Sequence, residues 1–335
     1  MSENLNEKNG GPGIPASEAN GYVSLSARRQ SSGKLGDAVF KGVSYAFALS
    51  VIVLMALLFI VLVKESWLSI KAFGFSFIYT SVWDPVAQEF GALPSIYGTL
   101  VSSIIAIVIA VPISLGIAIF LTEMAPKRLK GPIGTAIELL ASIPSIIYGM
   151  WGLFVFAPFL SEYVEPFLID YLGFIPLFTG APLGIGMLPA GFILAIMIIP
   201  FISSVSRDIF QMVPSILKES GYGVGATKWE VIRKIVLPYA RSGVIGAVIL
   251  GLGRALGETM AVTFLIGNAQ EIKLSLLEPA TSISATLANE FTEAVEDLYL
   301  SSLVELGLIL FIITFIVLAL AKLLISRFSY KGGQL

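Results

Sequence analysis

Six long apolar segments alternate with shorter polar ones along the chain. The first segment runs from Gly42 to Val63 and lies between Lys41 and Lys64. A membrane-spanning helix needs about 20 apolar residues, whereas the apolar part of a signal peptide has only about 7–15. This segment therefore predicts an uncleaved first transmembrane helix. Five further transmembrane helices are expected within residues 90–122, 133–160, 184–206, 242–266 and 299–327.

The composition favours an all-α membrane protein. Hydrophobic residues make up 56% of the 335 residues and charged residues only 13%, whereas about 25% of a soluble domain is charged. Helices in lipid tolerate proline where neighbouring helices satisfy the freed carbonyl groups, so the spans are expected to form one assembled bundle. Five prolines lie inside or near the predicted spans: Pro112, Pro144, Pro158, Pro189 and Pro200.

Charge and residue usage exclude several classes of function. The net charge is −2, so the chain lacks the basic field that binds nucleic acid. It has no cysteine and no histidine, which excludes Cys or His metal sites, cysteine nucleophiles and His-based triads. An intramembrane enzyme would need paired carboxylates or a Ser–Lys dyad. Glu258 is the only acid deep in a predicted span and no lysine lies mid-span, so an enzyme is disfavoured.

The lysines and arginines predict the topology. Most of the 21 cluster in segments on one side of the predicted spans, which places both termini in the cytoplasm of a multi-pass protein of the cell (plasma or inner) membrane. The chain then divides into a disordered cytoplasmic tail (1–36), the first helix with an outer loop (37–94), a core (95–327) and a cytoplasmic C-terminal tail (328–335). Aromatic residues of the outer segment 67–93 favour a membrane-surface belt with a small packed loop; the alternative is a docking surface.

The longest inner loop, residues 207–241, predicts two short amphipathic helices. Val213, Ile216 and Leu217 lie at helical spacing, and a second apolar set follows at residues 231–235. Gly221, Gly223 and Gly225 separate the two sets with a flexible break. Helices lying flat on the membrane surface would have the same pattern, so the pattern alone leaves the role of the polar face open.

This loop resembles the inner loop of bacterial and archaeal ABC importer permeases. The shared pattern is Glu219, two small residues (Ser220 and Gly221), Gly225, nine further residues, and then Ile235-Val236-Leu237-Pro238. Ser-Gly replaces the commoner Ala-Ala. The resemblance implies a type I ABC importer permease-like fold and a coupling helix that docks on an ATPase subunit. Its expected contact residues are Glu219, Ser220, Gly221, Gly225, Ala226, Thr227, Lys228, Trp229, Leu237 and Pro238.

No Walker A pattern occurs in the chain, so ATP hydrolysis is assigned to a separate polypeptide. ATP with Mg²⁺ is expected in that partner, and no cofactor or metal is expected on this chain.

The predicted fifth span, "GLGRALGETMAVTFLIGN", carries Arg254 and Glu258 about halfway along. A charge at that depth costs about 2.5–3.5 kcal/mol on insertion scales. The two residues are four positions apart, so they share one face of a continuous helix, in the order less favourable for the helix dipole. An ion pair that locks two helices together is one interpretation. A charged pair that faces a polar substrate pathway is the other, and we favour it because charges inside a membrane are usually functional.

Three stretches resemble the permease subunits of phosphate ABC importers: "GRALGETMAV", "ELLASIPSIIYGMWG" and "LPSIYGTLVSSIIAIVIAVPISLGIAIFLTEMAP". The resemblance runs from about Trp67 to the C-terminus. It implies that Arg254 and Glu258 take part in the passage of phosphate through a subunit that is surrounded by membrane lipid. It also implies a PstA-type sister permease, a PstB-type ATPase dimer and a PstS-type phosphate-binding protein as partners. A permease for molybdate, tungstate or sulfate, or the PstA sister permease itself, is the alternative.

Overall fold

A computed structural model describes residues 16–329 of the protein, with side chains described from residue 36 to residue 323. The regular elements in this part of the chain are helices, apart from two isolated bridges. Six helical segments are long and apolar enough to cross a membrane, as the sequence predicts: residues 36–65, 93–124, 145–172, 187–211, 228–256 and 297–323. The chain forms two units, 1–61 and 62–335, which we describe separately.

The first unit consists of most of helix α1 (Ala16–Glu65). Large apolar side chains from Val39 to Val61 are exposed on every face of this helix. A helix that is apolar all round is suited to lipid or to a helical partner. Residues 1–15 of the predicted tail lie outside the described residues, and α1 includes residues 16–36, so the disordered tail stays a prediction.

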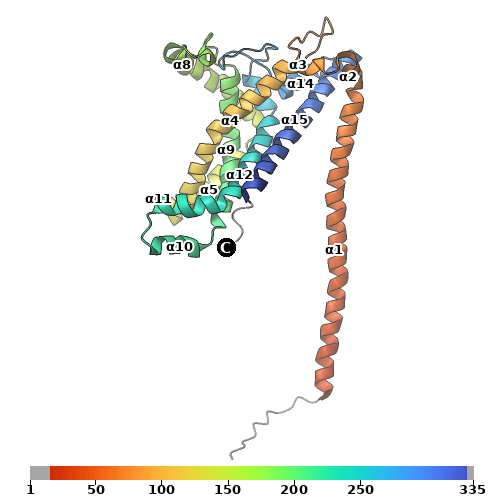
Figure 1. The fold of residues 1–335 in the computed structure, drawn as a ribbon, viewed down its shortest axis with the longest axis vertical. Coiled ribbons are helices and arrows are strands. Elements are labelled where there is room, and N and C mark those ends of the chain that lie inside the picture. The colour runs from red at the N-terminus through yellow and green to blue at the C-terminus, as the bar shows by residue number, and fades with distance from the viewer. Residues whose placement is uncertain (1–15, 330–335) are drawn as a thin grey trace, which may run out of the picture. The chain divides into compact units, whose positions relative to one another are not determined.

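The core of the second unit is a bundle of long helices. Helices α4 (Leu93–Ile119), α9 (Met187–Gln211), α12 (Leu237–Leu256) and α15 (Asp297–Ser329) run side by side (Figure 1). Helix α9 is the most buried of the spans, with 61% of its apolar window inside the protein. Glycines allow close helix contacts: Gly191 of α9 lies against Ile105 of α4, and Gly251 of α12 lies against Ile202 of α9.

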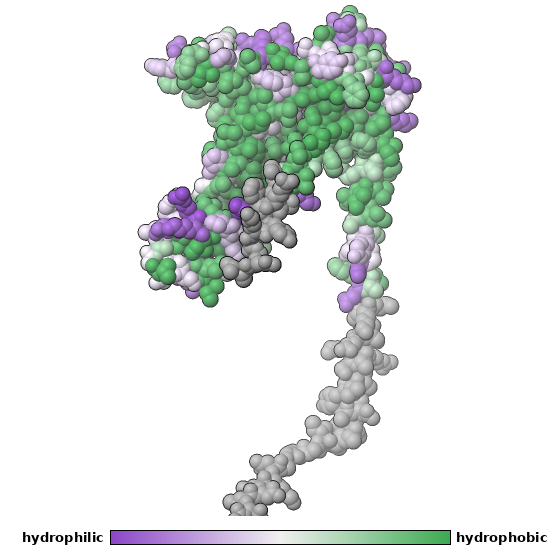
Figure 2. All heavy atoms as spheres, viewed as in Figure 1, coloured by the Kyte–Doolittle hydropathy of each residue, from purple (hydrophilic) through white to green (hydrophobic). Residues whose placement is uncertain are grey.

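The bundle has two polar ends, which we call the α10 end and the α14 end (Figure 1). Short helices α10 (Ser215–Gly223) and α11 (Lys228–Val231) lie at the first end. The second end carries α2 (Trp67–Phe73), α3 (Ser76–Tyr79), α8 (Glu165–Leu172) and α14 (Ile283–Glu290). Apolar side chains cover the middle of this unit, and hydrophilic ones gather at its ends (Figure 2). This distribution suits a bundle that crosses a bilayer.

The aromatic residues near α2 and α3 form a packed cluster, which confirms the predicted packed loop. Phe77 and Phe90 are buried, and the ring of Phe90 stacks on Tyr299 of α15 with centroids 5.3 Å apart. The Trp83 indole and the Tyr299 hydroxyl both donate hydrogen bonds to Glu290 Oε2, at 2.6 and 2.8 Å. One carboxylate therefore ties the loop to α14 and α15.

The third span lies further along the chain than predicted. Helix α5 (Lys127–Ala141) is separate and ends before Pro144, because proline lacks the N–H that would continue the helix. The apolar span then begins at α6 (Ser145–Trp151), passes through α7 (Ala157–Phe159) and ends with α8. Acidic residues 162, 165 and 170 consequently lie within helical segments and not in a loop. Single π-helical turns continue the α-helices at Phe120–Met124 (η1), Gly152–Phe156 (η2), Leu160–Val164 (η3) and Ile232–Val236 (η5), and Pro176–Phe178 (η4) is a separate 3-10 helix.

The prediction of one continuous fifth span over 242–266 is wrong. A helical segment begins at Lys228, passes through η5 and α12, and ends at Leu256. Gly257 caps α12, and a short helix α13 (Met260–Leu265) follows after the break. The inner loop is correspondingly shorter than the predicted 207–241, since α9 continues to Gln211.

Gly98 tests the packing of α4 against the segment before α14. A Cβ atom at Gly98 would lie 1.8 Å from the backbone oxygen of Thr281, so Gly98→Ala must displace one of the two backbones. We expect a loss of about 1–3 kcal/mol of stability, measured as thermal unfolding in detergent. Gly116→Ala on the same helix is the control, because nothing lies within 4 Å of its added methyl group. Equal stability of both variants would contradict the close approach.

Candidate functional site

The α10 end presents a helix–turn–helix unit built by local sequence signals. Helix α10 ends at Gly223, and Gly225 in the following turn has φ +86°, a conformation that favours glycine. Thr227 then caps α11: its hydroxyl accepts a hydrogen bond from the Glu230 N–H at 3.3 Å, and Glu230 Oε2 accepts from the Thr227 N–H at 3.0 Å. The predicted break therefore exists, although Gly221 and Gly223 lie within α10 and only Gly225 lies in the turn.

The two small residues of the sequence pattern have different surroundings. Gly221 is buried, and a Cβ atom there would lie 2.6 Å from Ile235 Cδ1 and 3.1 Å from Val231 Cγ2. Ser220 is exposed and donates to the Ile216 carbonyl at 2.7 Å. The second small position is therefore required for α10 to approach α11, and the first is not.

Most of the predicted contact residues are exposed together on this unit. Glu219, Thr227, Lys228 and Trp229 are exposed, and Ala226 is half-buried. Leu237 and Pro238 begin α12 and line a recess. Large apolar side chains that sequence reasoning did not assign also point outward here: Met212, Ile216, Tyr222 and Val224. Exposed apolar side chains that are clustered and rimmed by polar ones are typical of a protein–protein contact surface.

Sequence reasoning missed the ion pair that attaches α10 to α4. Lys218 Nζ lies 2.6 Å from Glu123 Oε1 in η1, the turn that continues α4. Their side chains are only 20% and 9% exposed. The partners are far apart in sequence, and no local pattern pairs them.

Arg254 and Glu258 lie on opposite sides of the helix break. Arg254 is exposed in the last turn of α12, and half-buried Glu258 precedes α13. No ion pair joins these two residues in the described part of the chain, so they do not form with each other the interhelical lock that was the alternative interpretation. Glu258 Oε1 instead accepts a long hydrogen bond, 3.5 Å, from the N–H of Ala261 in α13. A cation at a helix C-terminus and an anion near a helix N-terminus are each stabilised by the local dipole.

Helix α6 packs beside this break. An added Cβ at Gly149 would lie 2.7 Å from the Phe264 ring and 3.1 Å from Ala261 Cα, which shows how closely α6 approaches α13. The Tyr148 hydroxyl of α6 donates to the Leu140 carbonyl at 2.9 Å. The break thus has an exposed guanidinium on one side and a half-buried carboxylate on the other. Such groups can bind and release an oxyanion through charge-assisted hydrogen bonds.

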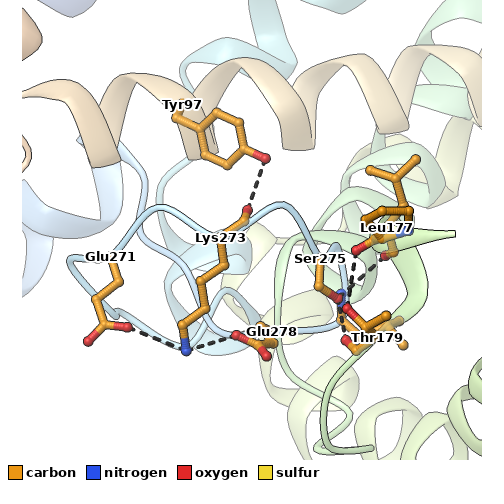
Figure 3. A network of polar contacts seen from close by, with 9 residues as sticks. Tyr97, Leu177, Thr179, Glu271, Lys273, Ser275 and Glu278 are labelled. Atoms are coloured by element: carbon orange, nitrogen blue, oxygen red, sulfur yellow. Dashed lines mark hydrogen bonds and ion pairs between the residues drawn. The ribbon is translucent and has the colours of Figure 1, made fainter. Parts of the chain in front are cut away.

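A second polar network orders the loop that connects α13 to α14 (Figure 3). Lys273 Nζ lies 2.8 Å from Glu278 Oε2 and 3.4 Å from Glu271 Oε2. The Tyr97 hydroxyl of α4 donates to the Lys273 carbonyl at 3.1 Å, and Ser275 donates to backbone carbonyls of residues 177 and 179. The hydrogen bond with Glu278, and then that with Glu271, raise the pKa of Lys273. The loop is therefore held by groups from α4 and from the segment after α8.

The fold matches known membrane subunits of ABC importers. A chain of the MetNI methionine ABC transporter in an inward-facing conformation superposes with a TM-score of 0.54 and 17% identity, over 74% of this chain and 99% of that chain. A chain of a bacterial alginate ABC transporter in complex with a periplasmic protein bound to an alginate pentasaccharide gives 0.57 and 19%, over 84% and 93%. At these identities the likeness shows the fold alone, which is that of type I ABC importer permeases.

Sequence comparison gives the family. The family model for the binding-protein-dependent transport system inner membrane component matches residues 110–330. The phosphate transport system permease protein PstC of Mesorhizobium japonicum is 58% identical over 89% of this chain and 93% of its own length. PstC of Pasteurella multocida is 56% identical over 89% and 94%. A probable PstC of Methanocaldococcus jannaschii is 39% identical over 74% and 81%.

The chain therefore belongs to the binding-protein-dependent transport system inner membrane components, in the group that includes these PstC permeases. It is a multi-pass inner membrane permease subunit of an ABC importer, as the sequence predicts.

The capping box of α11 can be tested by removing the Thr227 hydroxyl. Thr227→Ala should destabilise the start of α11 by about 1 kcal/mol and increase amide hydrogen exchange over residues 228–231. Thr227→Ser is the matched control, because serine keeps the accepting oxygen. Equal protection in the alanine and serine variants would show that the cap does not stabilise this turn.

The carboxylate pair at Lys273 predicts a change in lysine reactivity with pH. Its raised pKa keeps the Lys273 amine protonated to higher pH than an ordinary lysine, so acylation at about pH 9–10 should be slow. Glu278→Gln removes the largest cause of the shift and should speed labelling at that pH. Mass spectrometry of the labelled peptide gives the rate, and an unchanged rate in the variant would contradict this cause.

Proposed function

We propose that this chain is one of two membrane subunits of an ATP-driven phosphate importer and that the α10 end couples it to a separate ATPase. The observation that carries the phosphate assignment is the 58% identity to a phosphate permease over 89% of the chain. The exposed arginine at the break between α12 and α13 supports it, because a guanidinium offers planar paired donors that match phosphate oxygens.

The complete importer contains a PstA-type sister permease, a PstB-type ATPase dimer that binds ATP with Mg²⁺, and a PstS-type phosphate-binding protein. This chain contributes half of the pathway and hydrolyses no ATP itself. The lysine and arginine distribution places the α10 end and both termini in the cytoplasm. The α14 end then faces the compartment of the binding protein.

The helix–turn–helix unit at the α10 end is the docking surface for the ATPase. Trp229 is 61% and Val224 is 86% exposed, so these side chains can enter a cleft of a partner. Gly225 and the capping box fix the angle between α10 and α11. ATP binding closes the ATPase dimer, moves this unit and reorients the bundle, and hydrolysis returns it to the starting state.

Arg254 and Glu258 line the path of the substrate. Arg254 provides the positive charge that attracts phosphate past the break between α12 and α13. Glu258, on the other side of the break, keeps the empty site close to neutral and prevents the anion from remaining bound. The glycine-capped end of α12 leaves the guanidinium exposed instead of buried among helices.

Uptake of labelled phosphate tests this assignment. The chain is expressed with its sister permease, ATPase and binding protein in cells that lack their own high-affinity importer. Arg254→Gln should lower ATP-dependent uptake about 10- to 100-fold, because a hydrogen bond to a charged group contributes about 1.5–3 kcal/mol. Glu258→Gln should also slow uptake, and Arg128→Gln, an exposed arginine of α5, is the matched control.

Excess molybdate or sulfate distinguishes the alternatives. Phosphate uptake that ignores both competitors supports the phosphate assignment, whereas transport of one of those anions in place of phosphate overturns it and keeps the permease. Uptake that survives Arg254→Gln, with normal amounts of the assembled complex, would remove Arg254 from the path.

A further inference from the structure

Two side-chain contacts join helix α10 to segments other than α9, which precedes it in the chain. The first is the contact of Gly221 with Val231 and Ile235, which joins α10 to the segment that continues into α12. The second is the ion pair of Lys218 with Glu123, which joins α10 to the end of α4. Gly221 is the buried residue of α10. The helix is therefore connected to α9 through the chain, to the segment before α12 through Gly221, and to the end of α4 through Lys218.

The ion pair is short and largely withdrawn from water. The 2.6 Å distance and exposures of 20% for Lys218 and 9% for Glu123 differ from those of Lys234 and Glu230. That second pair lies within one helical segment, at 3.2 Å, with side chains 71% and 41% exposed. Exposed ion pairs contribute little, whereas breaking a sheltered pair leaves a charge without its partner. The Lys218–Glu123 pair is thus suited to hold two elements together.

The turn that carries Glu123 is itself firmly anchored. Leu121 in η1 is buried, and Lys130 of α5 donates a hydrogen bond to the Thr122 carbonyl in the same turn. The preceding turn of α4 packs Ala118 into an apolar cluster with Phe210 and Val213, which lead into α10. A force applied to α10 through Lys218 would therefore reach the end of α4.

We propose that Lys218 and Glu123 are positioning residues that make α10 and the end of α4 move as one body, so that ATPase movement reaches α4 as well as α12. This inference rests on the proposed coupling role of α10. Without the ion pair, α10 keeps its connections to α9 and α12 but loses its direct link to the end of α4, so less of the ATPase movement reaches α4. ATP hydrolysis then continues, and less solute is moved for each ATP hydrolysed.

The test uses the complete importer reconstituted in proteoliposomes, with phosphate moved per ATP hydrolysed as the readout. Lys218→Glu and Glu123→Lys should each lower this ratio about tenfold, and the combined charge swap should restore it in large part. Lys218→Arg keeps the charge and should stay close to wild type. Lys218→Gln should lower the ratio, whereas the control Lys234→Gln, which affects the exposed pair, should leave it unchanged.

In the second part of the experiment, a covalent cross-link replaces the ion pair. The chain has no cysteine, so Lys218→Cys with Glu123→Cys introduces the only pair of thiols in this subunit. The double variant should show the lowered ratio, and a short bismaleimide cross-linker should raise it toward the wild-type value. A loss of stability alone would reduce the amount of complex, which co-purification measures, and would not be reversed by cross-linking.

Two results would overturn the proposal: a wild-type ratio in both single charge reversals, or a cross-linked double variant that transports less than before cross-linking. The ratio can be read with whichever anion the complex imports, so a failure of the phosphate assignment is seen separately. If the complex imports nothing, cross-linking yield is compared with and without a non-hydrolysable ATP analogue. Equal yields support joint movement, and a yield that falls with the analogue contradicts it.

Discussion

A chain that crosses lipid must satisfy its own backbone hydrogen bonds, and this requirement determines where the present fold can be irregular. Breaks in the spans occur where other protein groups are at hand. At the break before Pro144, the Tyr148 hydroxyl donates to the Leu140 carbonyl, which also accepts from the Ile143 N–H. Within the bundle, the Ser114 hydroxyl of α4 donates to the carbonyl of Ile199 in α9 at 3.2 Å. Side-chain hydroxyl groups thus supplement the backbone hydrogen bonds at a helix break and within a span.

The number of spans could be predicted from the sequence because each is an apolar run of sufficient length. Their bounds could not, because interruptions depend on tertiary contacts. Residues 133–141 belong to α5 and not to the third span, although their apolar content resembles that of the span. The turn at Gly225 was predictable from glycine, whereas the reason for a small residue at Gly221 depends on Ile235, whose distance from α10 no sequence pattern gives.

The helix break between Arg254 and Glu258 changes how the helix dipoles act on these two charges. In one continuous helix their order would be unfavourable for the dipole, and the two side chains would share a face. Because α12 ends at Gly257, Arg254 lies at the C-terminus of one helix and Glu258 at the start of another. Each charge then has the favourable sign for its own helix end, worth about 0.3–1 kcal/mol in exposed positions. The break thereby lowers the cost of two charges without pairing them.

Short helices at the α10 end are stable only through their contacts with the rest of the unit. Helix α10 has nine residues and one buried position, too little to be stable by itself. Its conformation depends on contacts at two points, Gly221 toward α12 and Lys218 toward α4. An element fixed by its attachments moves with whatever holds it, so a displacement of α10 would be passed to the segments that it contacts.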